Sequence, residues 1–362
     1  MQKYLKYLCL KTAPELGPTK VLELCKLYPD IESFVGNPQH PIYRQGILKQ
    51  ATKAHLAGFV LPPNHEKITA LMQAQGIRYV AYPEANYPEK LREIYAAPLL
   101  LYIKGDLNSA LAQKCLAVVG TRKASAYGVE MCKKLLEPLA GQGVCIISGL
   151  ALGIDTAAHQ SALQGGGKTI AVLACGVDKV YPSYNKNLAD KIVQNGALIS
   201  EYEPGTEPER WNFPARNRLV SALSDAVFIV EGPLDSGAML TAKNALEQNR
   251  DIFALPGNIN NRNSAGPNHL IKHGAALIQS LEDLQVLLNM EVEKARQTEI
   301  FPELSPDEEK LVAIMREEQR TLSFDELLIT SGFGIGRLST QLTNLEIKGL
   351  IAKESGNSFF LI

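Results

Sequence analysis

The residues best suited to chemistry in this sequence form a short cluster of aromatic and basic side chains near the middle of the chain. Two rings and two guanidinium groups fall within eight residues, at Trp211, Phe213, Arg216 and Arg218, with Asn217 between the arginines. Guanidinium groups bind backbone phosphates, and exposed rings stack on unpaired bases. The cluster therefore favours a single-stranded nucleic acid as the ligand. The alternative, in which the rings pack in the core and the arginines point into water, stays open.

Three glycine-containing turns offer further donors for an anion, because each follows an apolar run of the kind that forms a strand. The turns are Gly120-Thr121-Arg122, Ser148-Gly149 and Ser236-Gly237. Glycine permits a ligand to approach the backbone closely, and the N–H groups of a following helix bind anions. For Gly153, just after the second turn, tight helix–sheet packing is an equally simple explanation. We expect phosphates at these turns.

The same turns differ from the two common nucleotide-binding loops. A dinucleotide site needs G-x-G-x-x-G and an acidic residue after the next strand, but Arg122 occupies the second glycine position and Ser148-Gly149 offers no carboxylate. The segment Gly165-Gly166-Gly167-Lys168 precedes its strand, whereas a P-loop follows one, and Ala162 replaces its first glycine. We therefore expect no nucleotide cofactor and no ATPase activity. Lys168 is left as a cation near the sheet.

The sequence offers little support for catalysis. No serine lies in a G-x-S-x-G elbow. His269 and His273 have the spacing of a metal pair but lack the H-E-x-x-H glutamate. His159, close to Asp155, could act as a general base, although a hydrogen-bonded structural histidine is the simpler interpretation. We expect a protein that is not an enzyme, with no catalytic residue, no metal and no cofactor.

Length and composition fit a normal globular protein of two or three domains, with 362 residues, 46% hydrophobic and 21% charged. The net charge of −1 excludes a globally basic nucleic-acid binder but not a local basic patch. The six cysteines form no C-x-x-C pair and are expected to be reduced and buried. No signal sequence or long apolar run is present, so we expect a cytoplasmic protein without a membrane anchor.

The elements that must position these residues lie between 76 and 288. Short apolar runs alternate there with helical stretches, at 116–119, 144–147, 170–174, 197–200, 226–230 and 252–255. This alternation predicts a Rossmann-like α/β domain, with a parallel sheet covered by helices on both faces. Its ligands should lie outside the carboxyl ends of the strands. A bridging segment at 76–110, rich in tyrosine and proline, precedes the main sheet.

Two smaller domains are expected at the ends of the chain. Residues 1–75 predict a helical (helix-hairpin-helix, SAM-like) domain, with two helices joined at Gly17-Pro18. Residues 289–306 are polar and predict a linker. Residues 307–362 predict a winged-helix domain of three helices and a terminal hairpin. Ten acidic against six basic residues at 303–362 argue against strong phosphate contacts by that domain.

In order and spacing over some 180 residues, the chain resembles the DNA-processing protein A family, also called Smf. The motifs are Tyr82-Pro83, Val119-Gly120-Thr121-Arg122, Ser148-Gly149 through Asp155, Tyr181-Pro182, Phe213 through Arg218, Ser236-Gly237 and Leu255-Pro256-Gly257. The resemblance implies a protein that binds single-stranded DNA and loads RecA recombinase onto it. It also implies protection of incoming DNA during natural transformation and homologous recombination, without covalent chemistry.

By the same resemblance, a phosphate pocket would be lined by Arg122, Lys168 and Arg216-Asn217-Arg218, with donors from Ser148 and Gly149. Leu152 departs from the family, which often has a basic or polar residue there. A homodimer through the Rossmann-like domain is also implied, and the apolar stretch 269–278 fits either that contact or the last helix and strand of the core. The competing function is a Rossmann-like enzyme that binds or processes nucleotides with the same glycine turns.

Overall fold

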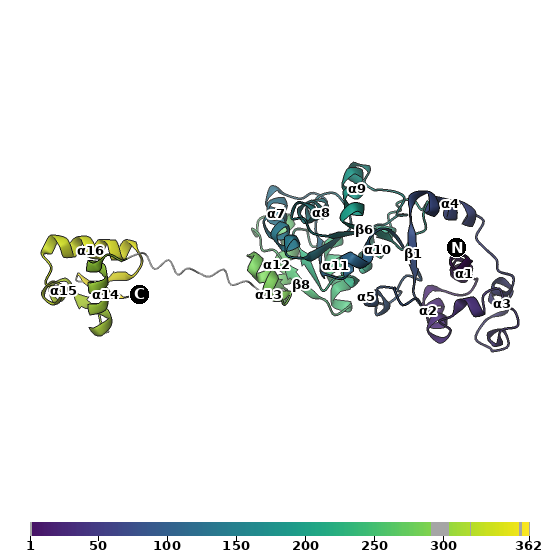
Figure 1. Ribbon diagram of the computed structural model, residues 1–362, viewed down its shortest axis with the longest axis horizontal. Helices are drawn as coiled ribbons and strands as arrows, with labels where there is room; N and C mark the ends of the chain where they lie inside the picture. The colour runs from purple at the N-terminus through teal and green to yellow at the C-terminus, as the bar shows by residue number, and fades with distance from the viewer. Residues whose placement is uncertain (1, 291–303, 319, 355–356, 362) are drawn as a thin grey trace. The chain divides into compact units, whose positions relative to one another are not determined.

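The computed structural model describes residues 2–290, 304–318, 320–354 and 357–361. The chain divides into two compact units, Met1–Val292 and Glu293–Ile362 (Figure 1). Most of the linker predicted at 289–306 lies outside the described residues. Within the described ranges, no helix combines the length and the hydropathy needed to span a bilayer.

One sheet organises the first unit, with nine described strands in the order β1-β2-β6-β5-β4-β3-β7-β8-β9. The strands are β1 Arg78–Ala81, β2 Leu100–Gly105, β3 Lys114–Val119, β4 Val144–Ser148, β5 Thr169–Val172, β6 Gly196–Ser200, β7 Ala226–Ile229, β8 Asp251–Ala254 and β9 Ala276–Leu277. All pairs from β6 to β9 are parallel. Each of the six apolar runs forms one of the strands β3 to β8, so the predicted α/β class is confirmed.

The sheet is not parallel throughout. The run 99–103, which the sequence placed in a bridging segment, forms β2 instead, and β2 pairs antiparallel with both β6 and β1. Tyr102, for example, lies opposite Ser200 and Tyr79. The pairing of β2 with β6 joins segments about a hundred residues apart, so local sequence could not reveal it. Four successive buried residues of β2 show why it joins the core.

Helices cover both faces of this sheet (Figure 1). The helices are α5 Glu89–Arg92, α6 Leu107–Leu111, α7 Ala126–Gly141, α8 Ile154–Gln164, α9 Lys186–Asn195, α10 Asn212–Ala222, α11 Gly237–Glu247, α12 Ala265–Lys272 and α13 Leu281–Leu287. Leu116 and Val118 of β3 point into a core with α7, α8 and α13. Cys115 and Ala117 point into the opposite core with α9, α10 and α11. This alternation is the period of two expected of a strand buried on both faces.

The amino-terminal helices are α1 Gln2–Lys11, α2 Pro18–Leu27, α3 Gln50–Ala57 and α4 His65–Gln75. Gly17 is the N-cap of α2 and Pro18 its first residue, as expected for proline at a helix start. Tyr4 of α1 reaches the sheet, where its hydroxyl lies 3.1 Å from that of Tyr102. The helical segment and the sheet thus share one core.

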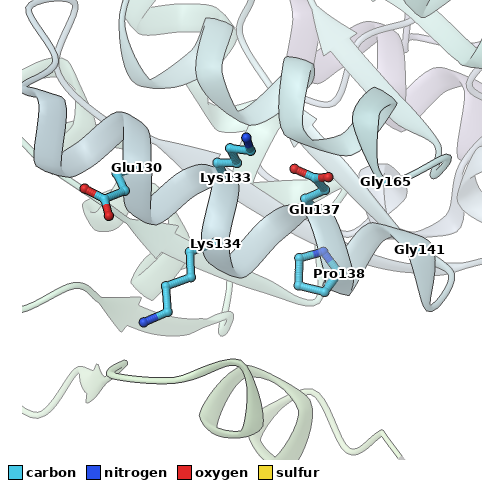
Figure 2. A pocket seen from close by; sticks show the side chains of 7 residues that line it. All are labelled: Glu130, Lys133, Lys134, Glu137, Pro138, Gly141 and Gly165. Atoms are coloured by element: carbon cyan, nitrogen blue, oxygen red, sulfur yellow. The ribbon is translucent and has the colours of Figure 1, made fainter.

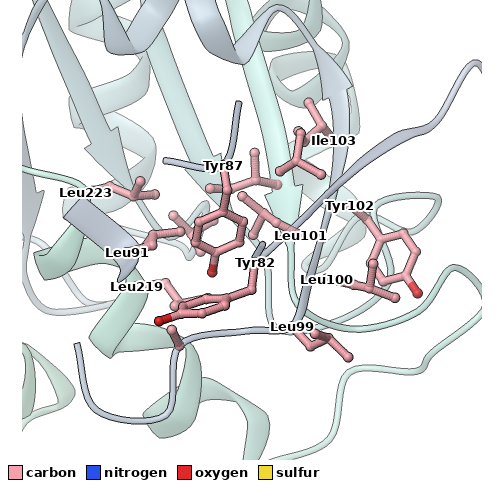
Figure 3. Close-up of a cluster of buried hydrophobic side chains, with 14 of the residues drawn as sticks. Tyr82, Tyr87, Leu91, Leu99, Leu100, Leu101, Tyr102, Ile103, Leu219 and Leu223 are labelled. Carbon is pink, nitrogen blue, oxygen red and sulfur yellow. The ribbon is translucent and has the colours of Figure 1, made fainter. Parts of the chain in front are cut away.

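The bridging segment also packs on the sheet unit. Figure 3 shows Tyr82, Tyr87 and Leu101 of β2 in one cluster with Leu219 of α10 and with Leu223, the residue that follows α10. The Tyr87 hydroxyl donates to the Pro98 carbonyl at 2.8 Å, so its polar atom is satisfied inside this cluster. Burial of these side chains fixes α10, the helix that carries the predicted arginine cluster.

The second unit has the predicted winged-helix elements. They are α14 Pro306–Glu318, β10 Leu322–Ser323, α15 Phe324–Ser331, α16 Ile335–Ile347, β11 Ile351–Glu354 and β12 Ser358–Leu361. Ser323 and Glu326 form a capping box at the start of α15. The short β10 adds a third strand to the hairpin of β11 and β12.

Candidate nucleic-acid interface

A cleft of about 850 Å³ opens at the carboxyl ends of the central parallel strands, and we call it the strand-end cleft. The predicted site residues that line it are Gly120, Thr121, Arg122, Phe213, Arg216, Asn217, Ser236 and Gly237. Its other lining residues are Val119, Ala151, Asp155, Tyr181, Pro208, Arg210, Pro214, Pro233, Ala238, Leu240 and Thr241. The position is the one expected for ligands of a doubly wound sheet.

The loop after β3 carries Arg122 and is held on two sides. The Thr121 N–H donates to the Glu231 carbonyl at 2.7 Å, and the Thr121 carbonyl accepts from Ile154 N–H at 3.2 Å. Gly153 has φ of +79°, and a Cβ there would lie 2.3 Å from the Thr121 oxygen. Glycine at 153 is therefore required by this close approach, and the backbone beneath Arg122 is fixed before any ligand binds.

The Arg122 guanidinium lies over the ring of Phe213, with its Cζ 5.0 Å from the ring centroid. Tyr181 meets the same ring edge-on, with centroids 5.7 Å apart. Such a cation–π contact at an accessible site is worth about 0.5–1 kcal/mol. Neither Arg122 nor the neighbouring Arg210 forms an ion pair with any carboxylate in the described part of the chain. Both positive charges are thus available to an anion in the cleft.

A second set of donors lies at the start of α11. Ser236 is the N-cap of α11 but makes no side-chain capping bond, and within the described residues its buried Oγ has no hydrogen-bond partner. The Asn217 side chain donates to the Gly237 carbonyl at 3.2 Å and ties α10 to this turn. A buried hydroxyl without a partner costs about 1–3 kcal/mol. An anion at this helix start would satisfy the hydroxyl and the first N–H groups together.

Arg216 differs from Arg122 in its environment, because its side chain is buried and hydrogen-bonded within the protein. It is 4% exposed, and its NH1 donates to the Gly149 carbonyl at 2.7 Å and also to the Val172 carbonyl. A Cβ at Gly149 would lie 2.4 Å from this nitrogen, so glycine is needed there. Burial lowers the pKa of Arg216, and the neighbouring Asp155 opposes that shift. Arg216 therefore joins the ends of β4 and β5 beneath the cleft and supplies positive charge from below.

Three other predicted residues lie outside the cleft lining. The Ser148 hydroxyl is fully buried and donates to the Val118 carbonyl at 2.7 Å. The Gly149 N–H donates to Asp155 Oδ2 at 3.1 Å. Arg218 pairs with Glu201. The Ser148 and Gly149 donors are therefore engaged within the protein, whereas Arg218 Nη1 is buried without a hydrogen-bond partner among the described residues.

Lys168 lies at the opposite edge of the sheet, because it directly precedes β5 and the cleft lies where the parallel strands end. The glycines before it serve packing. A Cβ at Gly165 would lie 2.0 Å from the Glu137 carbonyl, and one at Gly167 would lie 2.6 Å from Ala140. A second hollow, of about 560 Å³, is lined by this loop and the charged face of α7 (Figure 2). The strand-end cleft therefore does not include Lys168.

For two of the four side chains, the structure is the opposite of the alternative with buried rings and exposed arginines, and Phe213 and Arg218 are half-buried. Trp211 is 70% exposed, whereas Arg216 is buried. Sequence reasoning placed both rings and both guanidinium groups in one equivalent cluster. It could not separate them, because the direction of each side chain depends on where α10 begins and on what α10 packs against.

The histidines considered as catalytic candidates lie away from the cleft lining. His159 is fully buried, and its Nδ1 lies 2.7 Å from Thr169 Oγ1. Burial lowers its pKa to about 3, with a smaller contribution from Arg216. The Asp155 carboxyl does line the cleft, and burial raises its pKa against the opposing charge of Arg216. Its Oδ2 accepts from two backbone N–H groups, of Gly149 and Ala151, which is a structural role.

Sequence reasoning missed three residues that the structure places at the site. Arg210 and Tyr181 line the cleft. Glu231 holds the Arg122 loop from behind and is 1% exposed. A signal existed for each: Arg210 adjoins the aromatic cluster, Tyr181 belongs to a recognised motif, and Glu231 follows the end of an apolar run where polar groups were expected.

Two family profiles together match most of the chain. The profile described as DNA recombination-mediator protein A matches residues 78–289. The profile described as DprA winged helix domain matches residues 295–357. The first match spans the whole sheet unit from β1, and the second spans the winged-helix unit.

Individual relatives agree with the profiles. The DNA processing protein DprA of Bacillus subtilis is 36% identical over 269 residues, which is 74% of this chain and 90% of that protein. The X-ray structure of DNA processing protein A from Streptococcus pneumoniae superposes with a TM-score of 0.66 at 34% identity, covering 78% of this chain and 97% of that one. DNA processing protein A from Helicobacter pylori, whose structure is described as giving insight into its single-stranded DNA binding mode, has a TM-score of 0.52 at 36% identity and covers 59% and 94%.

Proposed function

The chain belongs to the DNA recombination-mediator protein A family, and from this premise we propose that it binds single-stranded DNA by seating backbone phosphates in the strand-end cleft. The observation that carries the proposal is the position of the Arg122 guanidinium. It stacks over Phe213, lies on a loop whose backbone is held by hydrogen bonds, and has no carboxylate partner among the described residues. A guanidinium in that setting is suited to an external phosphate.

Two groups of donors in the cleft can each bind a phosphate of the DNA backbone. Arg122 and Arg210 supply charge on one side, and the Ser236 hydroxyl with the first N–H groups of α11 supplies donors on the other. None of these groups reads a base edge, so we expect little sequence preference. The buried Arg216 adds positive potential from beneath and needs no contact with the ligand.

The proposal also covers what happens to single-stranded DNA after it has bound. Following the family likeness, the protein loads RecA recombinase onto single-stranded DNA, acts as a homodimer, and protects incoming DNA during transformation and recombination. It does so by binding, without a covalent step. The stretch 269–278 forms the end of α12 and β9, which is an edge strand of the described sheet and therefore available to a second copy.

A binding series tests the proposal directly. Oligothymidine, a duplex of the same length and a panel of mononucleotides are titrated against the full chain at two salt concentrations. We expect tight binding of the single strand only, with a log–log salt slope that falls by about 0.7 in Arg122→Ala, since each phosphate contact to a single strand contributes that amount. Stabilisation by mononucleotides alone, read as a rise in melting temperature, would instead indicate a nucleotide-processing enzyme.

A further inference from the structure

We infer that Trp211 forms a nucleobase-stacking subsite on the rim of the strand-end cleft, separate from the phosphate seats. The inference rests on the proposed binding of single-stranded DNA and adds a contact to bases. It assigns the subsite to one side chain, which the sequence cluster did not distinguish from Phe213.

Phe213 is poorly suited to take a base, because its ring already has partners. The Arg122 guanidinium lies 5.0 Å above it and Tyr181 packs edge-on at 5.7 Å. A base that stacked on this ring would displace the guanidinium that the phosphate needs. We therefore assign Phe213 to the support of Arg122.

Trp211 has the opposite properties. In the sequence it follows Arg210 and precedes Phe213 by two residues, and both of these residues line the cleft, yet its own side chain is 70% exposed. Among the described residues it makes no ring–ring or cation–π contact. A large ring exposed next to unpaired cations is the arrangement with which single-strand binders hold successive nucleotides, one by its phosphate and one by its base.

The backbone that carries Trp211 is fixed, so the ring is presented to the ligand at little entropic cost. Asn212 is 5% exposed, and its side chain donates to the Ala174 carbonyl at 3.1 Å. Its N–H donates to the Glu209 carbonyl at 3.0 Å. The turn into α10 is thereby attached to the loop that follows β5, so the exposed indole extends from an anchored backbone.

Trp211 is the only tryptophan of the chain, so intrinsic fluorescence reports on this position alone. The full-length protein is titrated with oligothymidine and with an oligomer of equal length in which abasic tetrahydrofuran sites replace every thymidine. Both carry the same phosphates. We expect quenching of Trp211 emission by oligothymidine and little by the abasic strand, which should also bind about fivefold or more weakly, the equivalent of about 1 kcal/mol of stacking.

Variants separate stacking from charge. Trp211→Ala should weaken oligothymidine binding about fivefold, leave abasic binding unchanged, and leave the salt slope unchanged, because no phosphate contact is lost. Trp211→Phe keeps a ring and should retain most of the affinity. Tyr95→Ala is the matched control, because Tyr95 is 83% exposed and does not line the cleft, and it should behave as wild type.

Each outcome decides the inference. Equal affinity and equal quenching for the two oligomers would overturn the subsite while leaving phosphate binding in place. A loss of affinity in Trp211→Ala that is the same for both oligomers would also overturn it, since that result indicates a distorted α10 start. If neither oligomer binds the wild-type protein, the proposed function itself fails, and the two failures are thereby distinguished.

Discussion

The carboxylate of Glu231, which is 1% exposed, accepts two hydrogen bonds from Ser125, one from its backbone N–H at 2.9 Å and one from its hydroxyl at 2.5 Å. Ser125 is the N-cap of α7 and ends the loop that carries Arg122. The Glu231 carbonyl holds the other end of that loop through Thr121. Glu231, in the segment that follows β7, thus determines where the cationic loop after β3 lies.

We predict that Glu231→Ala weakens single-strand binding through Arg122. Loss of the carboxylate removes both hydrogen bonds to the partly buried Ser125, which costs about 1–3 kcal/mol of folding free energy and loosens the loop. Urea unfolding measures the first effect and DNA titration the second. If Glu231 acts by positioning Arg122, its effect on affinity should disappear in an Arg122→Ala background. Additive losses would contradict this role, and Glu130→Ala on the exposed face of α7 serves as control.

A second prediction concerns the two edges of the sheet. Arg122→Ala should reduce the salt slope, whereas Lys168→Ala should change neither slope nor affinity, because Lys168 lies at the amino ends of the strands. The two substitutions remove the same charge, which makes them a matched pair. Equal losses in both would require a DNA path that reaches both edges of the sheet.

The third prediction is a pH dependence of stability that comes from His159. Its pKa is lowered by burial to about 3 in the folded chain, against 6.5 when exposed. As pH falls below 6.5, the unfolded chain takes up a proton that the folded chain does not. The stability that neutral His159 contributes is therefore complete above pH 6.5. It is lost on acidification, by at most about 1.4 kcal/mol of unfolding free energy per pH unit. Urea unfolding from pH 7 to pH 5 should show this slope, and His159→Gln should lack it.

The winged-helix unit should contribute little to strand affinity. Arg337 of α16 donates to both carboxylate oxygens of Asp307, at 2.6 and 2.7 Å, so its charge is already paired. We expect Arg337→Ala and a chain ending at residue 302 to keep most single-strand affinity at the same salt concentration. A tenfold loss in the shortened chain, with its first unit still folded by thermal unfolding, would show that α14 to α16 bind DNA.

The sequence by itself predicted most of the elements and led to the proposed class of ligand. Buried runs such as 144–147 predicted strands because a doubly covered parallel sheet needs continuous apolar strands. The turns at Gly120 and Ser236 were recognisable because they follow such runs, and parallel strands end at one edge. Arg122 at the second fingerprint glycine, together with the missing carboxylate after the next strand, argued against a dinucleotide site.

Only the tertiary structure decided what each side chain of the arginine cluster does. Arg216 and Trp211 are close in sequence, yet Arg216 is a buried residue of the cleft lining and Trp211 is 70% exposed. Lys168, by contrast, could be assigned to an edge from the sequence, because it precedes its strand and the ligands of a parallel sheet lie beyond the carboxyl ends. Residue types and local spacing determine which elements form, but the direction of a side chain is set by contacts with segments distant in the chain. For Arg216 these contacts are the carbonyls of Gly149 and Val172, which become neighbours only when β4 and β5 pair.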